Sequence, residues 1–173
     1  ENHGCYNVLW KAYAHLPDTF IAWNQFSYEF IQERLGVPTE LNQIHFEFKQ
    51  GDSVLVTLGS DFDGLEEFVK RLNKIVKVKL RQHPRHGMPK NLQNLGVEIC
   101  PQSDSILESL NGCMLHITKA SGCFFQAMDM GVPTLLISHK SKDWYEFYKE
   151  TNLVFYSTDN WLEIVSSIIR KKD

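Results

Sequence analysis

The sequence lacks the signatures of membrane-spanning and secreted chains. All of its apolar runs are shorter than the ~20 residues that a transmembrane helix needs. The opening segment ENHGCYNVLW has no basic stretch followed by an apolar one, so a signal peptide is not expected. An initiator methionine is also absent, and we expect the sequence to be a piece of a longer protein.

Spacings typical of metal sites and disulfide frameworks are absent as well. The 4 cysteines show no paired metal-binding spacing, and no two of the 7 histidines stand four residues apart. Such cysteines are typical of a reduced, cytosolic protein, in which a buried thiol behaves as a small apolar side chain. We therefore expect no disulfide framework, no metal and no cofactor.

The charge balance disfavours nucleic acid as a ligand. A net charge of −3 is not that of a general nucleic-acid binder. Basic residues are nevertheless concentrated, because residues 70–96 contain no Asp or Glu. This window holds Lys70, Arg71, Lys74, Lys77, Lys79, Arg81, Arg85 and Lys90. A local basic patch on a mildly acidic chain favours a small anionic ligand over a polyanion.

After residue 51 the chain contains a regular alternation of strand and helix patterns. Buried-strand runs stand at 52–60, 77–83, 97–101, 113–120, 133–138 and 153–157. Helical spacing is found at 61–75, 103–112, 121–131, 142–151 and 158–172. This alternation predicts an α/β fold with a Rossmann-like, open parallel sheet flanked by helices.

Residues 1–50 differ from this series. The segment 19–24 is typical of a strand, 25–36 of a helix that ends at Gly36, and 41–48 of a further extended segment. We predict a short N-terminal βα extension at 1–50, a boundary at Gly51–Asp52 and a Rossmann-like domain at 51–173.

The second strand run carries cationic side chains towards its carboxyl end. Ligands of open parallel sheets bind outside the carboxyl ends of the strands. Strand alternation would place Arg81, His83 and Arg85 on one side, and guanidinium and imidazolium groups suit phosphate oxygens. We expect these residues to bind phosphate; the alternative is a solvated basic edge.

Two further strand ends carry small, hydroxyl or basic residues. The first run ends at Gly59–Ser60, and the fourth passes through Lys119 into Ser121–Gly122. A turn into a helix presents backbone N–H groups and the positive end of the helix dipole, which favour an anion. The alternative is an ordinary capped helix. Three such strand ends in one sheet predict a phosphate site.

Other polar residues have a structural interpretation. Asp61 and Asp63 follow the first strand and could hold Mg²⁺ or Mn²⁺. We favour Asp61 as a helix cap, with Asp63 complementing the helix dipole. We expect Ser103 or Asp104 to cap the helix at 103–112. His116 lies inside a strand and is expected to be a core histidine.

From about residue 51 the chain resembles the C-terminal, donor-binding half of a GT-B fold glycosyltransferase. It is most similar to the bacterial enzymes of capsule, O-antigen and teichoic-acid synthesis. The resemblance rests on Thr57–Ser60, on Arg81–Pro84, and on the segment from Ser121 to Thr134. UDP-sugar 2-epimerases share the same half-fold.

The resemblance implies roles for particular residues. Arg81, His83, Ser121 and Gly122 would contact the phosphates of a nucleotide-sugar donor. The sequence departs from the family at Gln126, where many relatives have a Glu that holds a sugar or ribose hydroxyl. A glutamine can also hydrogen-bond a hydroxyl.

The implied function is donor binding by part of a glycosyltransferase that makes a bacterial surface polysaccharide. Residues 1–50 resemble the end of the acceptor-side domain, through which a glycan or lipid-linked acceptor would bind. We expect these 173 residues alone to be inactive, and the protein to be cytoplasmic, or peripheral to the inner membrane if its acceptor is lipid-linked.

Two alternatives to the transferase are kept. One is half of a nucleotide-sugar 2-epimerase. The other is a non-catalytic α/β domain, either a nucleotide-sugar sensor or a regulatory domain of the receiver type. A receiver needs an acceptor Asp at the end of its third strand, and that strand here ends at Cys100–Pro101.

Overall fold

The computed structural model describes residues 18–22, 25–30, 32–33, 36–42, 49–59 and 64–170. The chain divides into two units, residues 1–47 and 48–173, which are described separately. In the first unit, β1 (Phe20–Ala22) pairs in parallel with β2 (Thr39–Leu41), and α1 (Gln25–Phe30) lies between them in sequence. The predicted extended segment at 41–48 falls largely outside the described residues.

The second unit contains one parallel sheet, in the order β5-β4-β3-β6-β7-β8. Every neighbouring pair in it is parallel. Its strands are β3 (Ser53–Thr57), β4 (Lys77–Arg81), β5 (Glu98–Ile99), β6 (Cys113–Thr118), β7 (Thr134–Leu136) and β8 (Val154–Tyr156).

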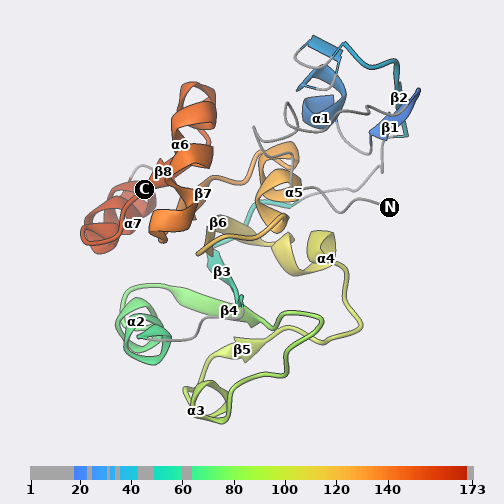
Figure 1. Cartoon of the computed structure of the whole chain (residues 1–173). Coiled ribbons are helices and arrows are strands. Elements are labelled where there is room, and N and C mark those ends of the chain that lie inside the picture. The colour runs from blue at the N-terminus through green and yellow to red at the C-terminus, as the bar shows by residue number, and fades with distance from the viewer. Residues whose placement is uncertain are drawn as a thin grey trace. The chain divides into compact units, whose positions relative to one another are not determined.

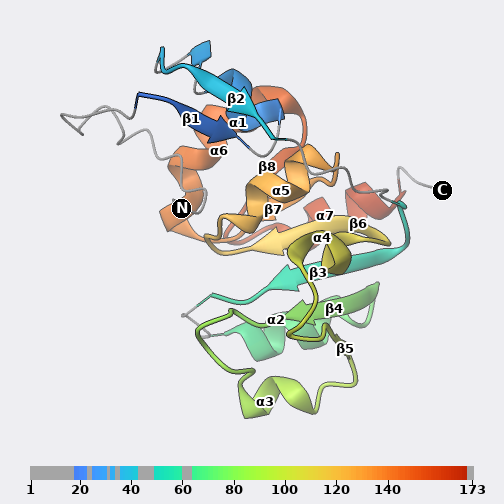
Figure 2. The same ribbon diagram turned by 90° about the vertical axis from the view of Figure 1, so that its right-hand side faces the viewer.

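Helices cover both faces of this sheet. They are α2 (Leu65–Leu72), α3 (Lys90–Gln93), α4 (Ile106–Leu110), α5 (Cys123–Asp129), α6 (Lys142–Tyr148) and α7 (Trp161–Arg170). Short 3₁₀ turns flank α6 at His139–Ser141 and Lys149–Thr151. Figure 1 shows α2 and α7 on one side of β3 and β6, with α4 and α5 on the other, and Figure 2 looks onto the sheet from the side of α4, with α2 behind it.

Alternate residues of β3 enter two apolar cores. Val54 and Val56 belong to the core that α2 and α7 cover. Leu55 points to the other face, where Leu110 of α4 and Ala127 of α5 cover it. All five residues of β3 are buried, as expected for a central strand of a sheet with helices on both faces.

The predicted fold class is confirmed: the second unit is a Rossmann-like α/β structure with an open parallel sheet. Counted from β3, its strands lie in the order 3-2-1-4-5-6 of the doubly wound dinucleotide-binding folds. The order reverses between β3 and β6, which makes their carboxyl ends the point at which ligands bind in such sheets. A receiver-type sheet has the order 2-1-3-4-5 instead.

Several helix ends differ from the sequence-based expectation. Ser105, and neither Ser103 nor Asp104, caps α4, because Ser105 forms a capping box with Glu108. Gly64 occupies the N-cap of α2 with a φ of 71°, and it has no side chain to make a cap. The expected cap Asp61 lies outside the described residues. The helix α3 was not predicted, since its single turn is too short for a periodic pattern.

The chain enters β3 through a close approach of two backbone segments. The amide of Gly112 donates to the carbonyl of Lys49 at 2.8 Å, and the hydroxyl of Ser53 donates to the carbonyl of Gly112 at 2.7 Å. A Cβ atom on Gly51 would overlap that same carbonyl oxygen. Only glycine fits at this position without moving backbone, and the contact ties the start of β3 to the start of β6.

We expect Gly51→Ala to lower the free energy of unfolding by about 1–3 kcal/mol, because the new methyl group overlaps backbone atoms that cannot turn aside. Urea unfolding measures this change. Gly87→Ala is the control, since a Cβ there meets nothing within 4 Å, and its effect should stay within about 0.5 kcal/mol. Equal stability of the two variants would contradict the close approach.

Candidate functional site

The carboxyl ends of three neighbouring strands carry the residues that the sequence singled out. Thr57, the last residue of β3, pairs with Arg81 of β4 on one side and with Thr118 of β6 on the other. Gly59 follows β3, and Lys119 follows β6 and leads into α5. The structure therefore brings these strand ends to one edge of the sheet. Ser60 lies outside the described residues.

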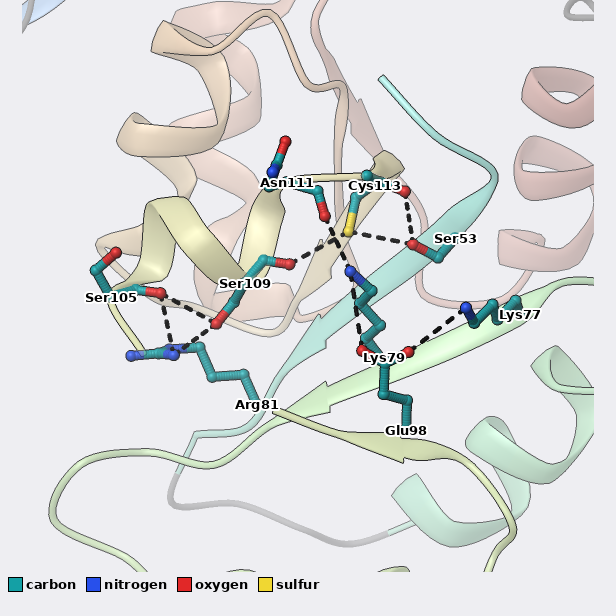
Figure 3. A network of polar contacts seen from close by, with 10 residues as sticks. Ser53, Lys77, Lys79, Arg81, Glu98, Ser105, Ser109, Asn111 and Cys113 are labelled. Atoms are coloured by element: carbon teal, nitrogen blue, oxygen red, sulfur yellow. Dashed lines mark hydrogen bonds and ion pairs between the residues drawn. The ribbon is translucent and has the colours of Figure 1, made fainter. Parts of the chain in front are cut away.

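Arg81 ends β4, and its guanidinium group reaches the first turn of α4. Nη1 donates to the hydroxyl of Ser109 at 2.6 Å and to the carbonyl of Ser105 at 3.3 Å. Nη2 donates to the carbonyl of Asp104 at 2.7 Å. Figure 3 shows the side chain extended from β4 towards Ser105 and Ser109. All three acceptors are neutral, so these contacts orient the cation and leave its charge in place.

Arg81 also acts on the first residue of α5. The amide of Cys123 donates to the hydroxyl of Ser121 at 3.3 Å. Burial raises the pKa of the Cys123 thiol, while a hydrogen bond from Ser121 and the positive charge of Arg81 act in the opposite direction. Two predicted site residues from different strand ends, Arg81 and Ser121, therefore influence one thiol at the start of α5.

His83 lies beyond the strand, contrary to the expected alternation. Since β4 ends at Arg81, the residues His83 and Arg85 belong to a loop and share no strand face with it. The Nδ1 atom of His83 accepts the backbone N–H of Arg85 at 3.1 Å. Burial, His86 and Arg85 all lower the pKa of His83, in that order. The neutral ring therefore carries its proton on Nε2 and presents it as a hydrogen-bond donor.

The basic window at residues 70–96 does not form one patch. Lys79 donates to the carbonyl of Asn111 at 2.9 Å and lies 3.9 Å from a carboxylate oxygen of Glu98, which Lys77 approaches at 3.6 Å. These three side chains are drawn in Figure 3. Lys70 pairs with Glu66 at 2.6 Å. Local pairing thus reduces the basic patch that composition suggested.

The side chain of Gln126, on α5, contains a buried hydrogen-bond acceptor. Its side-chain oxygen Oε1 is buried, and no described residue donates a hydrogen bond to it. A buried carbonyl oxygen without a partner costs free energy, so such an atom suits a site at which a ligand donor arrives.

The described residues line hollows at the carboxyl edge. A small one of about 20 Å³ is lined by Arg81, Gln82, Pro84, Cys100, Pro101 and Gln102. A larger one of about 240 Å³ lies towards the face of α2 and α7. It is lined by Gly64, Leu65, Glu67, Phe68, Arg71, Lys119, Ile137, Thr158 and Trp161.

Of the residues around the larger hollow, sequence analysis named only Lys119 as a site residue. It counted Arg71 in the basic window without assigning it to a site, and it missed Thr158. The guanidinium carbon of Arg71 lies 5.3 Å from the centre of the Trp161 ring. Thr158 follows β8 and could have been found by the same strand-end rule. Arg71 and Trp161 come from helices far apart in the sequence, so no local spacing marks their pairing.

His116 belongs to the core, as predicted. It is fully buried, with Nε2 3.0 Å from the hydroxyl of Thr57 and Nδ1 3.2 Å from the hydroxyl of Thr134. The ring therefore links β3, β6 and β7. Burial lowers the pKa of His116 to about 3, so the ring is neutral in the folded protein at ordinary pH.

Among the described residues, no group of three or more His, Cys, Asp and Glu side chains could hold a metal ion. Asp61 and Asp63, considered above as metal ligands, lie outside these residues. No helix in the described part of the chain has the length and apolar character to cross a bilayer.

The sheet order and the donors at its carboxyl edge define a doubly wound, Rossmann-like α/β protein. No protein-family model matches the chain, and no curated protein matches it.

We expect the stability of the protein to fall with pH below about 6.5 through His116. The unfolded chain binds a proton at this histidine below about pH 6.5, whereas the folded protein binds it only near pH 3. Stability from this group is complete above pH 6.5 and declines as the pH falls, by about 1.4 kcal/mol per pH unit.

Urea unfolding at a series of pH values measures this slope. His116→Gln should flatten it, because glutamine does not titrate and can still bond both threonines. His139→Gln, at an exposed histidine, should keep the wild-type slope. An unchanged slope in His116→Gln would show that other groups cause the acid dependence.

Proposed function

We propose that this chain binds the nucleotide-sugar donor of a glycosyltransferase that makes a bacterial surface polysaccharide. The observation that carries the proposal is the strand register, which brings the ends of β3, β4 and β6 together at the carboxyl edge beside the switch point, with Arg81 at the end of β4 and Ser121 in the turn after β6. This edge is where nucleotides bind in doubly wound sheets. The resemblance of the motifs to the donor-binding half of GT-B enzymes supports the same ligand.

The chemistry of the edge suits a diphosphate. Arg81 offers a fixed guanidinium group, which can bind phosphate oxygens through two parallel N–H bonds. His83 offers a neutral Nε2–H donor, and Ser121 a hydroxyl. During glycosyl transfer, negative charge grows on the leaving diphosphate. Donors held in place before the reaction stabilise that charge without having to reorganise.

Gln126 is the residue that we propose for a hydroxyl of the donor. Its buried Oε1 is an acceptor and lacks a donor among the described residues. A ribose or sugar hydroxyl would supply the missing hydrogen bond. The proposed set of donor-binding residues is completed by Gly59, Ser60, Arg85, Lys119 and Gly122.

The acceptor and the general base belong to the acceptor side of the enzyme in this proposal. A glycan or lipid-linked acceptor would approach through the acceptor-side domain, to which residues 1–50 contribute. Donor binding without turnover is therefore the activity that we propose for these residues. The proposed location is the cytoplasm, with peripheral attachment to the inner membrane where the acceptor is lipid-linked.

Calorimetric titration of the chain with CMP, CDP, UDP, GDP and dTDP tests the proposal. We expect saturable binding of at least one nucleotide, with the diphosphate form preferred. His83→Ala and Ser121→Ala should each weaken it tenfold or more, which corresponds to about 1.4 kcal/mol, because each removes a hydrogen-bond donor to phosphate.

Lys74→Ala provides the control for a general loss of positive charge, since Lys74 is exposed beyond the end of α2 and away from the carboxyl edge. Its affinity should stay within twofold of wild type. Absence of binding by every nucleotide, or equal weakening in all three variants, would overturn the proposed donor site.

A further inference from the structure

The guanidinium group of Arg81 is held in place by several hydrogen bonds. A guanidinium group carries five N–H donors, and three of its hydrogen bonds here go to one short segment, Asp104–Ser109. None of the described residues accepts a hydrogen bond from Nε. The fork of donors is thus anchored at one end and has donors left for a further partner.

The hydroxyl of Ser109 accepts a hydrogen bond from Arg81 and donates one to the backbone. Ser109 is 2% exposed, and its Oγ donates to the carbonyl of Ser105 at 3.1 Å. A hydroxyl has a single hydrogen to donate, so its oxygen is left to accept from Nη1 of Arg81 at 2.6 Å. A guanidinium group can only donate, so the bond from Ser109 to the carbonyl of Ser105 leaves the serine oxygen to accept from Arg81.

The first turn of α4 is itself fixed. The amide of Ser105 donates to the carboxylate of Glu108 at 2.6 Å, and the amide of Glu108 donates to the hydroxyl of Ser105 at 3.2 Å. These two bonds form a capping box, which satisfies the amides at the start of the helix. The turn that accepts the hydrogen bonds of Arg81 is thus itself stabilised by a capping box. Figure 3 shows Arg81, Ser105 and Ser109 together.

The support orients the charge of Arg81 without pairing it. No ion pair among the described residues includes Arg81. The nearby carboxylate of Glu108 is committed to the capping box, and its pKa is lowered chiefly by the bonds from Ser105, with Arg81 as the smallest cause. A partly buried cation held by neutral dipoles alone suits an anion that arrives as a ligand.

We propose that Ser109 is a positioning residue for anion binding, which acts through Arg81 and touches no ligand. It holds the guanidinium plane so that the remaining N–H donors face the diphosphate of a nucleotide at the carboxyl edge. This inference rests on the proposed function, in which Arg81 contacts the donor phosphates.

Titration of the chain with inorganic pyrophosphate tests this role. The variants are Ser109→Ala, Arg81→Lys and the double variant. We expect Ser109→Ala to weaken binding about tenfold, because the guanidinium loses its shortest anchor. In the Arg81→Lys background, Ser109→Ala should change the affinity less than twofold, since lysine has no fork for the serine to orient.

A second variant tests whether weaker binding is caused by unfolding of the protein. Ser109→Cys keeps nearly the same volume at this buried position, and a thiol is a weak acceptor. It should weaken pyrophosphate binding as Ser109→Ala does, while its thermal unfolding midpoint stays close to that of wild type.

The outcomes separate this inference from the proposed function. If the wild type binds and Arg81→Lys weakens binding but neither Ser109 variant does, the positioning role is overturned and the donor site stands. Equal weakening by Ser109→Ala with and without Arg81 would also overturn it, since the serine would then act through the fold. If the wild type binds neither pyrophosphate nor any nucleotide, both proposals fail.

Discussion

The parallel pairing of β3 with β6 is the contact on which the rest of this structure depends. β3 is buried on both faces, and β6 joins it although two other strands come between them in sequence. The pairing is tied at its start by the approach of Gly51 to Gly112. Inside the sheet, the buried ring of His116 on β6 is hydrogen-bonded to the hydroxyl of Thr57 on β3. Because the strand order reverses at this pair, the carboxyl edge opens there.

The electrostatics of that edge follow from how its cations are held. Lys79 lies before the end of β4, where it forms an ion pair with Glu98 and donates a hydrogen bond to the carbonyl of Asn111. Arg81 lies two residues further along β4, and its guanidinium group donates hydrogen bonds only to neutral acceptors in the segment Asp104–Ser109. Two bases of one strand thus differ in their partners: the first pairs with the edge strand β5, and the second has no ion pair among the described residues. The two residues can be distinguished only by the hydrogen-bond and ion-pair partners of their side chains, and strand periodicity does not predict those partners.

Sequence patterns were sufficient for the fold class, because the strand runs and the longer helices after residue 51 each have a clear period, whereas the single turn of α3 does not. They also placed His116 in the core. They were less informative about the site. The alternation that would align Arg81 with His83 fails because β4 ends at Arg81. The cap of α4 is Ser105, where Ser103 and Asp104 are equally good capping residues by type. Ser109 carried no sequence signal, since its role depends on a long-range contact with Arg81.

The most direct test of the account is a ¹H–¹⁵N spectrum of the chain during titration with inorganic pyrophosphate, with the Nε–H signal of Arg81 assigned. The account predicts that this signal and the amides of Gly122 and Cys123 shift together and saturate with one dissociation constant. The Nε–H signal of Arg170, at the far end of α7 and bonded to the carbonyl of Ser166, should not move. If Arg81 stays unshifted while pyrophosphate moves other signals, or moves none, the carboxyl edge is not the anion site.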